Sequence, residues 1–187
     1  ALGVKIAADH LAIVRVNLDG EVLEKGDDPF DSTAPDAATR LAKHLRDVIE
    51  RGPRTRLLGV GIGVAGIADA RGVVDAPILG WRNVALGPTL RAELGLPVLI
   101  DNDVNTLAVA ERLYGRGRDV EHFLTLTIGR GVGLGIVVGG DLYRGARGGA
   151  GEFGHVTIDV GGPPCTCGKR GCLEALVADP ALVRQAI

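Results

Sequence analysis

The chain has 187 residues, of which 46% are hydrophobic and 24% charged, and its formal net charge is −2 at pH 7. This length and apolar content are enough for one large or two small domains with a buried core. The charge gives no basic surplus of the kind that favours nucleic acid or a membrane surface. No apolar run reaches the roughly 18 residues of a membrane-spanning helix, and no signal-like segment opens the sequence. A cytoplasmic protein without a membrane partner is therefore expected.

The N-terminal part of the sequence alternates short strand and helix patterns. Residues 2–26 alternate apolar and polar positions around an Asp19-Gly20 turn signal, which predicts three antiparallel strands. A helical stripe follows from Ser32 and ends at Gly52-Pro53. The pattern then predicts a buried strand within 57–66, a short helix over 89–95, a strand over 97–101 and a helix over 103–115. This succession is typical of an α/β sheet with ligands at strand ends.

The layout of the first segment recurs later in the chain. Residues 123–145 again predict a strand, a tight turn, a strand, a glycine turn and a short strand, which indicates two related halves. The polar stretch 115–121 separates them, so the predicted domains are residues 1–118 and 119–187. The alternative is that any two β-meanders look alike at this level of detail.

All three cysteines of the chain, Cys165, Cys167 and Cys172, lie within eight positions and follow His155. An odd number of cysteines in one short loop favours reduced thiols over disulfides. Three thiolates and one imidazole can converge on a tetrahedral zinc ion that leaves no position open for water, which predicts a structural zinc site. The alternative is three free cysteines buried beside a surface histidine, but this glycine-rich loop offers no hydrophobic core in which to bury them. Glu152 and Glu174 flank the loop, so zinc would hold both carboxylates beside one cleft.

Six stretches together resemble the ROK family (repressor, open reading frame, kinase), which groups sugar kinases with sugar-responsive repressors. They are GVAGIAD, APILGWRNVAL, PVLIDNDVNTLAVAE, TIGRGVGLGIVVGGDLYRG, GAGEFGH and CTCGKRGCLE. The resemblance implies an α/β, actin-like and hexokinase-like (ribonuclease H-like) fold of duplicated domains with a sugar cleft between them. It also implies a dimer or tetramer. Family members are longer, so we expect a chain truncated at its C-terminus within the second domain, which includes the zinc loop 155–172.

The resemblance also implies roles for individual residues. In the family, the asparagine and aspartate that match Asn102 and Asp103 face the sugar, and Asp103 would be the catalytic base of a kinase. The other sugar-binding positions implied are Gly66, whose backbone would approach the ligand, and Glu152, His155 and Glu174. His155 would use one ring nitrogen for zinc and the other for the sugar. A plainer interpretation makes Asp101, Asn102 and Asp103 a helix N-cap cluster, of which one residue caps.

The phosphate-binding loops depart from the kinase pattern. Family kinases carry Asp-x-Gly-Gly-Thr in the first hairpin, where this chain has Lys5, Ala7, Ala8 and Asp9. The methyl groups would obstruct phosphate, and Asp9 would repel it. Arg130 replaces the usual threonine of the second loop.

That second loop keeps its glycines, so it is a phosphate-loop remnant made of Gly129, Arg130, Gly131 and Gly133. An arginine can itself contact phosphate, which leaves this second departure ambiguous. Ile78 stands where many family kinases have a polar residue near the sugar.

These departures favour the sugar-sensing part of a ROK-family transcriptional regulator, with a small-molecule sugar as effector and structural zinc. Its DNA contacts would come only from an N-terminal winged helix-turn-helix that this sequence lacks. The alternative is an ATP-dependent sugar kinase of the glucokinase or N-acetylhexosamine kinase type, which would need ATP and Mg²⁺. A third interpretation, a zinc-stabilised scaffold without a ligand, leaves the concentration of polar cleft residues unexplained.

Overall fold

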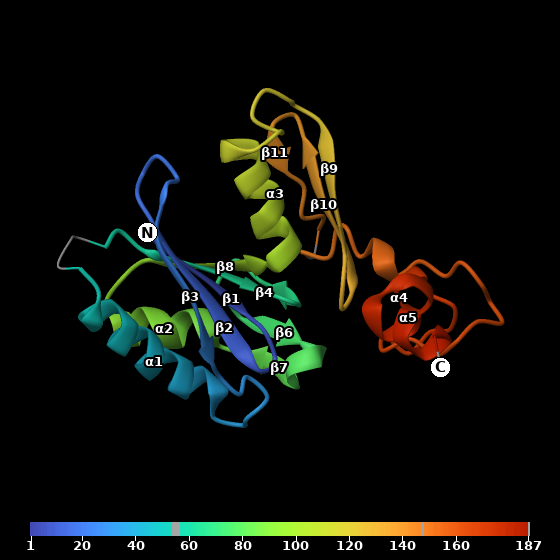
Figure 1. Cartoon of the computed structure of the whole chain (residues 1–187), viewed down its shortest axis with the longest axis horizontal. Helices are drawn as coiled ribbons and strands as arrows, with labels where there is room; N and C mark the ends of the chain where they lie inside the picture. Colours follow the sequence, from blue (N-terminus) through green and yellow to red (C-terminus); the bar gives the residue numbers. More distant parts are fainter. Residues whose placement is uncertain (54–56, 147, 187) are drawn as a thin grey trace. The chain divides into compact units, whose positions relative to one another are not determined.

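The structure of the chain is a computed structural model that describes residues 1–53, 57–146 and 148–186. The chain divides into two compact units, Ala1–Thr106 and Leu107–Ile187. In Figure 1 the first unit runs from blue to green and the second from yellow-green to red. The division falls within helix α3 (Asp103–Tyr114), N-terminal to the boundary of 118/119 that the sequence predicts.

The first unit is built on a five-stranded sheet. Its strands are β1 (Leu2–Ile6), β2 (His10–Val16), β3 (Val22–Pro29), β4 (Val60–Val64) and β8 (Val98–Asn102), in the order β3-β2-β1-β4-β8. The first three strands are antiparallel, and β4 pairs in parallel with both β1 and β8. The three-stranded opening and the two later strands predicted from the sequence are thus confirmed.

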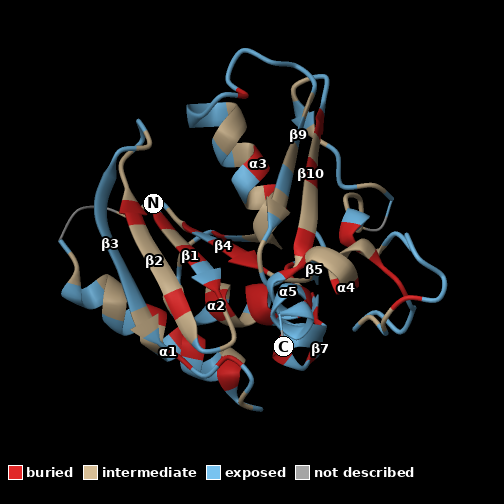
Figure 2. Ribbon diagram, turned by 45° about the vertical axis from the view of Figure 1, so that its right-hand side comes forward, coloured by how far each residue is buried: buried red, intermediate tan, exposed pale blue. Residues whose placement is uncertain are grey.

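Helices α1 (Ala37–Arg51) and α2 (Leu86–Leu94) supply the apolar side chains that cover one face of this sheet (Figure 1). Leu41 and Leu45 of α1 pack in one core with Ile62 of β4. Figure 2 shows the buried residues gathered along β1, β2 and β4. In β1 the burial alternates, because Val4 and Ile6 are buried whereas Lys5 between them is exposed on the opposite face. That opposite face therefore carries the charged side chain of the strand.

A small second sheet completes this unit. It consists of β5 (Ile67–Ala68), β6 (Val74–Ala76) and β7 (Trp81–Val84), with a 3₁₀ turn η1 at Pro77–Leu79. The Trp81 indole N–H donates to the Ser32 carbonyl at 2.8 Å, which ties this sheet to the start of the α1 segment. Ile78 lies in η1 with about half of its side chain exposed.

The second unit contains an antiparallel sheet, β9 (Phe123–Ile128), β10 (Val132–Val138) and β11 (Asp141–Leu142), in the order β11-β10-β9. This confirms the strand pattern predicted for residues 123–145. After the sheet come η2 (Phe153–His155) and the short helices α4 (Leu173–Val177) and α5 (Asp179–Gln185). On the edge strand β9 every second residue is an exposed apolar one, at Leu124, Leu126 and Ile128. Within the described residues, no helix is both long and apolar enough to cross a bilayer.

Candidate functional site

Asn102 ends β8 and caps helix α3. Its Oδ1 accepts hydrogen bonds from the backbone N–H groups of Val104 (2.8 Å) and Asn105 (3.2 Å), which would otherwise lack intrahelical partners. Its Nδ2 donates to the Gly66 carbonyl at 3.0 Å. The prediction that one residue of the Asp-Asn-Asp cluster caps the helix is therefore confirmed. Capping commits the amide oxygen of Asn102 to the protein and leaves its second amide N–H available for a ligand.

Gly66 lies in the turn between β4 and β5, where β6 comes very close. A Cβ at this position would collide with the Asp75 carbonyl oxygen and lie 2.8 Å from the Ala76 Cα. Close packing within the first unit therefore requires glycine at position 66. The sequence predicted a different reason, the approach of the ligand to the backbone there. Its carbonyl holds Asn102, so Gly66 and Asn102 are brought together as expected.

A second polar layer supports the start of α3. Asp101 Oδ1 accepts from the Asn102 backbone N–H (2.8 Å) and from Asn105 Nδ2 (2.9 Å). Asn105 is 3% exposed, and the sequence analysis missed it. The spacing of four residues between Asp101, just before the predicted helix, and Asn105 in its first turn was the available signal.

Asp103, the first residue of α3, is held by a lysine from β1. Lys5 Nζ lies 3.0 Å from Asp103 Oδ2, and the side chains are 62% and 17% exposed respectively. In the sheet, Lys5 is in register with Gly63 of β4, and Gly63 is in register with Asp101 of β8. The residue that stands where kinases carry an aspartate therefore forms an ion pair with the predicted base.

The first hairpin turn is closed by its own backbone. Ala7 N–H donates to the His10 carbonyl at 3.0 Å, and the Asp9 carbonyl accepts from Phe30 N–H at 3.0 Å. The Asp9 carboxylate lies 2.9 Å from His10 Nδ1. This turn therefore presents an exposed carboxylate where the kinase pattern has a hydroxyl.

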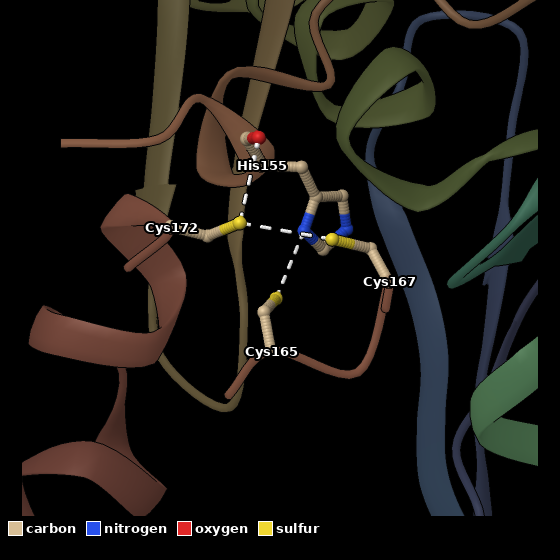
Figure 3. A group of neighbouring side chains, drawn as sticks. All are labelled: His155, Cys165, Cys167 and Cys172. Atoms are coloured by element: carbon tan, nitrogen blue, oxygen red, sulfur yellow. Dashed lines mark hydrogen bonds between the residues drawn. The ribbon is translucent and has the colours of Figure 1, made fainter. Parts of the chain in front are cut away.

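The cysteine cluster gathers as the sequence predicts. Ligand atoms of His155, Cys165, Cys167 and Cys172 all lie within 4.8 Å of one another, and Figure 3 shows the four side chains converging on one point. His155 Nδ1 is 3.5 Å from Cys165 Sγ, and Cys167 Sγ is 3.6 Å from Cys172 Sγ. A tetrahedral zinc ion with bonds of about 2.3 Å to sulfur and about 2.0 Å to nitrogen would set these separations at about 3.5 and 3.8 Å. The cluster can therefore hold a metal ion such as zinc.

Two of the thiols have different acid strengths. A hydrogen bond from the Lys169 backbone lowers the pKa of exposed Cys167, because it favours the thiolate. Burial raises the pKa of the Cys172 thiol to about 11. Without a metal, Cys167 is thus the readily ionised thiol and Cys172 stays protonated.

The predicted sugar ligands of the second unit lie beside the metal cluster and the glycine loop. His155 presents Nδ1 to the thiols, and its Nε2 lies 3.7 Å from Glu152 Oε2. Glu174 Oε2 accepts from the Val132 backbone N–H at 3.0 Å. Helix α4 is thereby tied to the start of β10.

The glycine loop between β9 and β10 makes several contacts of its own. Gly129 N–H donates to the Gly131 carbonyl at 3.0 Å, and the Gly129 carbonyl accepts from Asp179 N–H at 2.8 Å. Arg130 is exposed at the tip, and Gly133 pairs with Thr127 across the hairpin. Two backbone donors of this loop, at Gly129 and Val132, are therefore used within the unit.

The predicted sugar residues form two groups, one in each unit. Gly66, Asn102 and Asp103 belong to Ala1–Thr106, and the remaining residues belong to Leu107–Ile187. Within each group the side chains lie on adjoining elements.

Comparison with known proteins identifies this arrangement. The model of the ROK family matches residues 1–186. The chain belongs to the ROK family. A putative xylose repressor of Caldicellulosiruptor sp. (strain Rt8B.4) is 37% identical over 196 residues, which cover 97% of this chain and 47% of that protein. The chain thus spans about half the length of this ROK relative.

Solved ROK structures show the same fold. A ROK family transcriptional regulator, a homologue of the E. coli MLC protein, superposes with a TM-score of 0.88 at 32% identity. The match covers 98% of this chain and 48% of the regulator's chain. A ROK family glucokinase from Streptomyces griseus, in complex with glucose and AMPPNP, gives a TM-score of 0.87 at 34% identity. The match covers 100% of this chain and 59% of the glucokinase chain. The fold is therefore the actin-like, hexokinase-like fold of the ROK family, and it is shared by regulators and kinases.

Proposed function

We propose that the chain is the sugar-binding, effector-sensing part of a ROK-family transcriptional regulator. The observation that carries this proposal is the ion pair between Lys5 and Asp103. A kinase needs a carboxylate that can accept the proton of the attacking hydroxyl, together with a metal that neutralises the phosphates. Here the ammonium group of Lys5 forms an ion pair with the carboxylate of Asp103. Lys5 also places a positive charge where the kinase pattern has a negatively charged aspartate.

The two phosphate loops support the same conclusion. Asp9 adds negative charge at the first turn, where it opposes phosphate. The N–H groups of Gly129 and Val132 are already hydrogen-bonded within the second unit. Phosphoryl transfer depends on positioned donors around the phosphates, so the carboxylate at the first loop and the two committed N–H groups at the second disfavour ATP chemistry.

The proposed mode of action is a population shift. A sugar that binds one conformation of the regulator more tightly than another favours that conformation. In an oligomeric regulator, that shift would alter how DNA-reading segments outside this chain are presented. Zinc bound by His155 and the three cysteines would order residues 155–172 and hold Glu152 in place, without taking part in chemistry.

The alternative function is an ATP-dependent sugar kinase. It is favoured by Asp103, which keeps the position of the base, and by the similarity to a glucokinase solved with glucose and AMPPNP. This alternative requires Lys5 to release Asp103 when ATP and Mg²⁺ bind.

Sugar-dependent ADP release separates the two functions. The protein is incubated with Mg²⁺ and ATP and a panel of hexoses, pentoses and N-acetylhexosamines, alongside the Asp103→Asn variant. We expect no sugar-dependent ADP from either protein, while at least one sugar raises the melting temperature of the wild type. Sugar-dependent ADP release that Asp103→Asn abolishes would establish the kinase instead.

A further inference from the structure

Lys5 and Asp103 form a pair of opposite charges at the edge of the proposed sugar site. Lys5 Nζ is 3.0 Å from Asp103 Oδ2, and both residues belong to the first unit. The ammonium has three N–H donors and the carboxylate has about four acceptor sites, so the contact between them uses only part of the capacity of each. Lys5 remains 62% exposed, and among the described residues it makes no other ion pair. Both groups can therefore also bind a ligand.

The sheet places the backbones of Lys5 and Asp103 within reach of each other's side chains. Lys5 points away from the core, because Val4 and Ile6 on either side of it are buried. Its register neighbour Gly63 has no side chain, and a Cβ there would lie 3.0 Å from Thr106 Oγ1 and 3.3 Å from the Asp103 Cα. The start of α3 thus lies directly over β4. Lys5 can consequently reach Asp103 across one strand, with a donor and an acceptor held side by side.

A donor and an acceptor at this spacing suit a particular chemical group. Adjacent hydroxyl oxygens of a vicinal diol lie about one hydrogen-bond length apart, roughly 3 Å. One hydroxyl can donate to Asp103 while its neighbour accepts from Lys5. The pair carries no net charge, so it favours a neutral polyhydroxylated ligand over a phosphate, and the ammonium repels a divalent cation.

We propose that Lys5 is a sugar-binding residue and that Lys5 and Asp103 together recognise a vicinal diol of a neutral sugar. This inference rests on the proposed function, because it assumes that a sugar binds at Asp103. It adds a sugar contact that the sequence did not indicate. Lys5, which stands where the kinase pattern has an aspartate, binds the sugar in the absence of a nucleotide.

Calorimetric titration with D-xylose and D-glucose tests the inference. Lys5→Met removes the ammonium and nearly keeps the length of the side chain, while Lys43→Met, on the exposed side of α1, is the matched control. We expect Lys5→Met to weaken binding of the tighter of the two sugars by about tenfold or more, the size of one hydrogen bond to a charged group. Lys43→Met should bind as the wild type does. Lys5→Gln, which keeps a donor but no charge, should fall between them.

Monodeoxy analogues of the same sugar distinguish a direct contact from a structural role. In the wild type, removal of the hydroxyl that faces Lys5 should cost about tenfold in affinity, and in Lys5→Met that same removal should cost nothing further. If every deoxy penalty is the same in both proteins, or if Lys5→Met binds with wild-type affinity, Lys5 does not contact the sugar and the proposed function still stands. If the wild type binds no sugar of the panel of hexoses, pentoses and N-acetylhexosamines, both proposals are wrong.

Discussion

Zinc binding should release protons in a number that the structure sets. Three thiols must lose their protons to become zinc ligands, so at most three thiol protons can leave per zinc ion. Cys172, whose pKa burial raises to about 11, contributes one full proton at pH 7.5. Cys167, whose pKa is lowered, contributes less than one. We therefore predict that more than one and fewer than three thiol protons leave per zinc ion.

Calorimetry in two buffers of different ionisation enthalpy at pH 7.5 measures this number directly. One zinc ion should bind per chain, and the apparent affinity should rise by roughly one to three powers of ten per pH unit near neutrality. Cys167→Ser, which changes an exposed ligand, should weaken zinc and lower the proton count. His10→Ala changes an exposed histidine of the other unit and should have no effect. Release of fewer than one proton per zinc ion, or a zinc affinity that does not change with pH, would refute thiolate ligation.

Three further predictions concern the same elements. In the zinc-free chain at pH 8, Cys167 should react with iodoacetamide first and Cys172 last, because their pKa values are lowered and raised; peptide mass spectrometry reads the order, and equal rates would contradict it. Glu174→Ala removes the acceptor of the Val132 N–H, so urea denaturation should show a loss of about 1–3 kcal/mol, and an unchanged midpoint would argue against this bond. In the intact regulator, Glu152→Ala should abolish the sugar response but leave DNA affinity nearly unchanged. If the variant still dissociates from operator DNA when sugar is added, Glu152 is not part of the sugar site.

Several features could be predicted from the sequence because each depends on neighbours in the chain. The loop from His155 to Cys172 carries the histidine and the three cysteines within a short span, so spacing and donor type were sufficient to predict that they converge. A cap within the Asp-Asn-Asp cluster follows from a strand pattern that ends there before a helical pattern, and the structure assigns it to Asn102. The hairpins of residues 2–26 and 123–145 were likewise visible as alternation around turn signals.

Other features depend on strand order, which a single sequence does not provide. The pairing of Lys5 with Asp103 requires β1, β4 and β8 to be adjacent, and these residues are far apart in the chain. The need for glycine at position 66 arises from the close approach of β6, whose pairing with β5 the sequence pattern did not indicate. Strands β5 to β7 have only two to four residues each, too few for a periodic signal.

The most direct test of a sensor that binds sugar without phosphorylating it is the sugar affinity measured with and without nucleotide. The protein is titrated with D-xylose and D-glucose in the absence of nucleotide, and again with Mg²⁺ and the non-hydrolysable analogue AMPPNP at saturating concentration. We predict that one of the two sugars binds with the same Kd under both conditions, since Lys5 neutralises Asp103, Asp9 repels phosphate at the first turn, and two N–H donors of the second loop are already hydrogen-bonded. Sugar binding that appears or tightens by more than about tenfold only with nucleotide would show reciprocal coupling between the two ligands and would contradict the account in favour of a kinase.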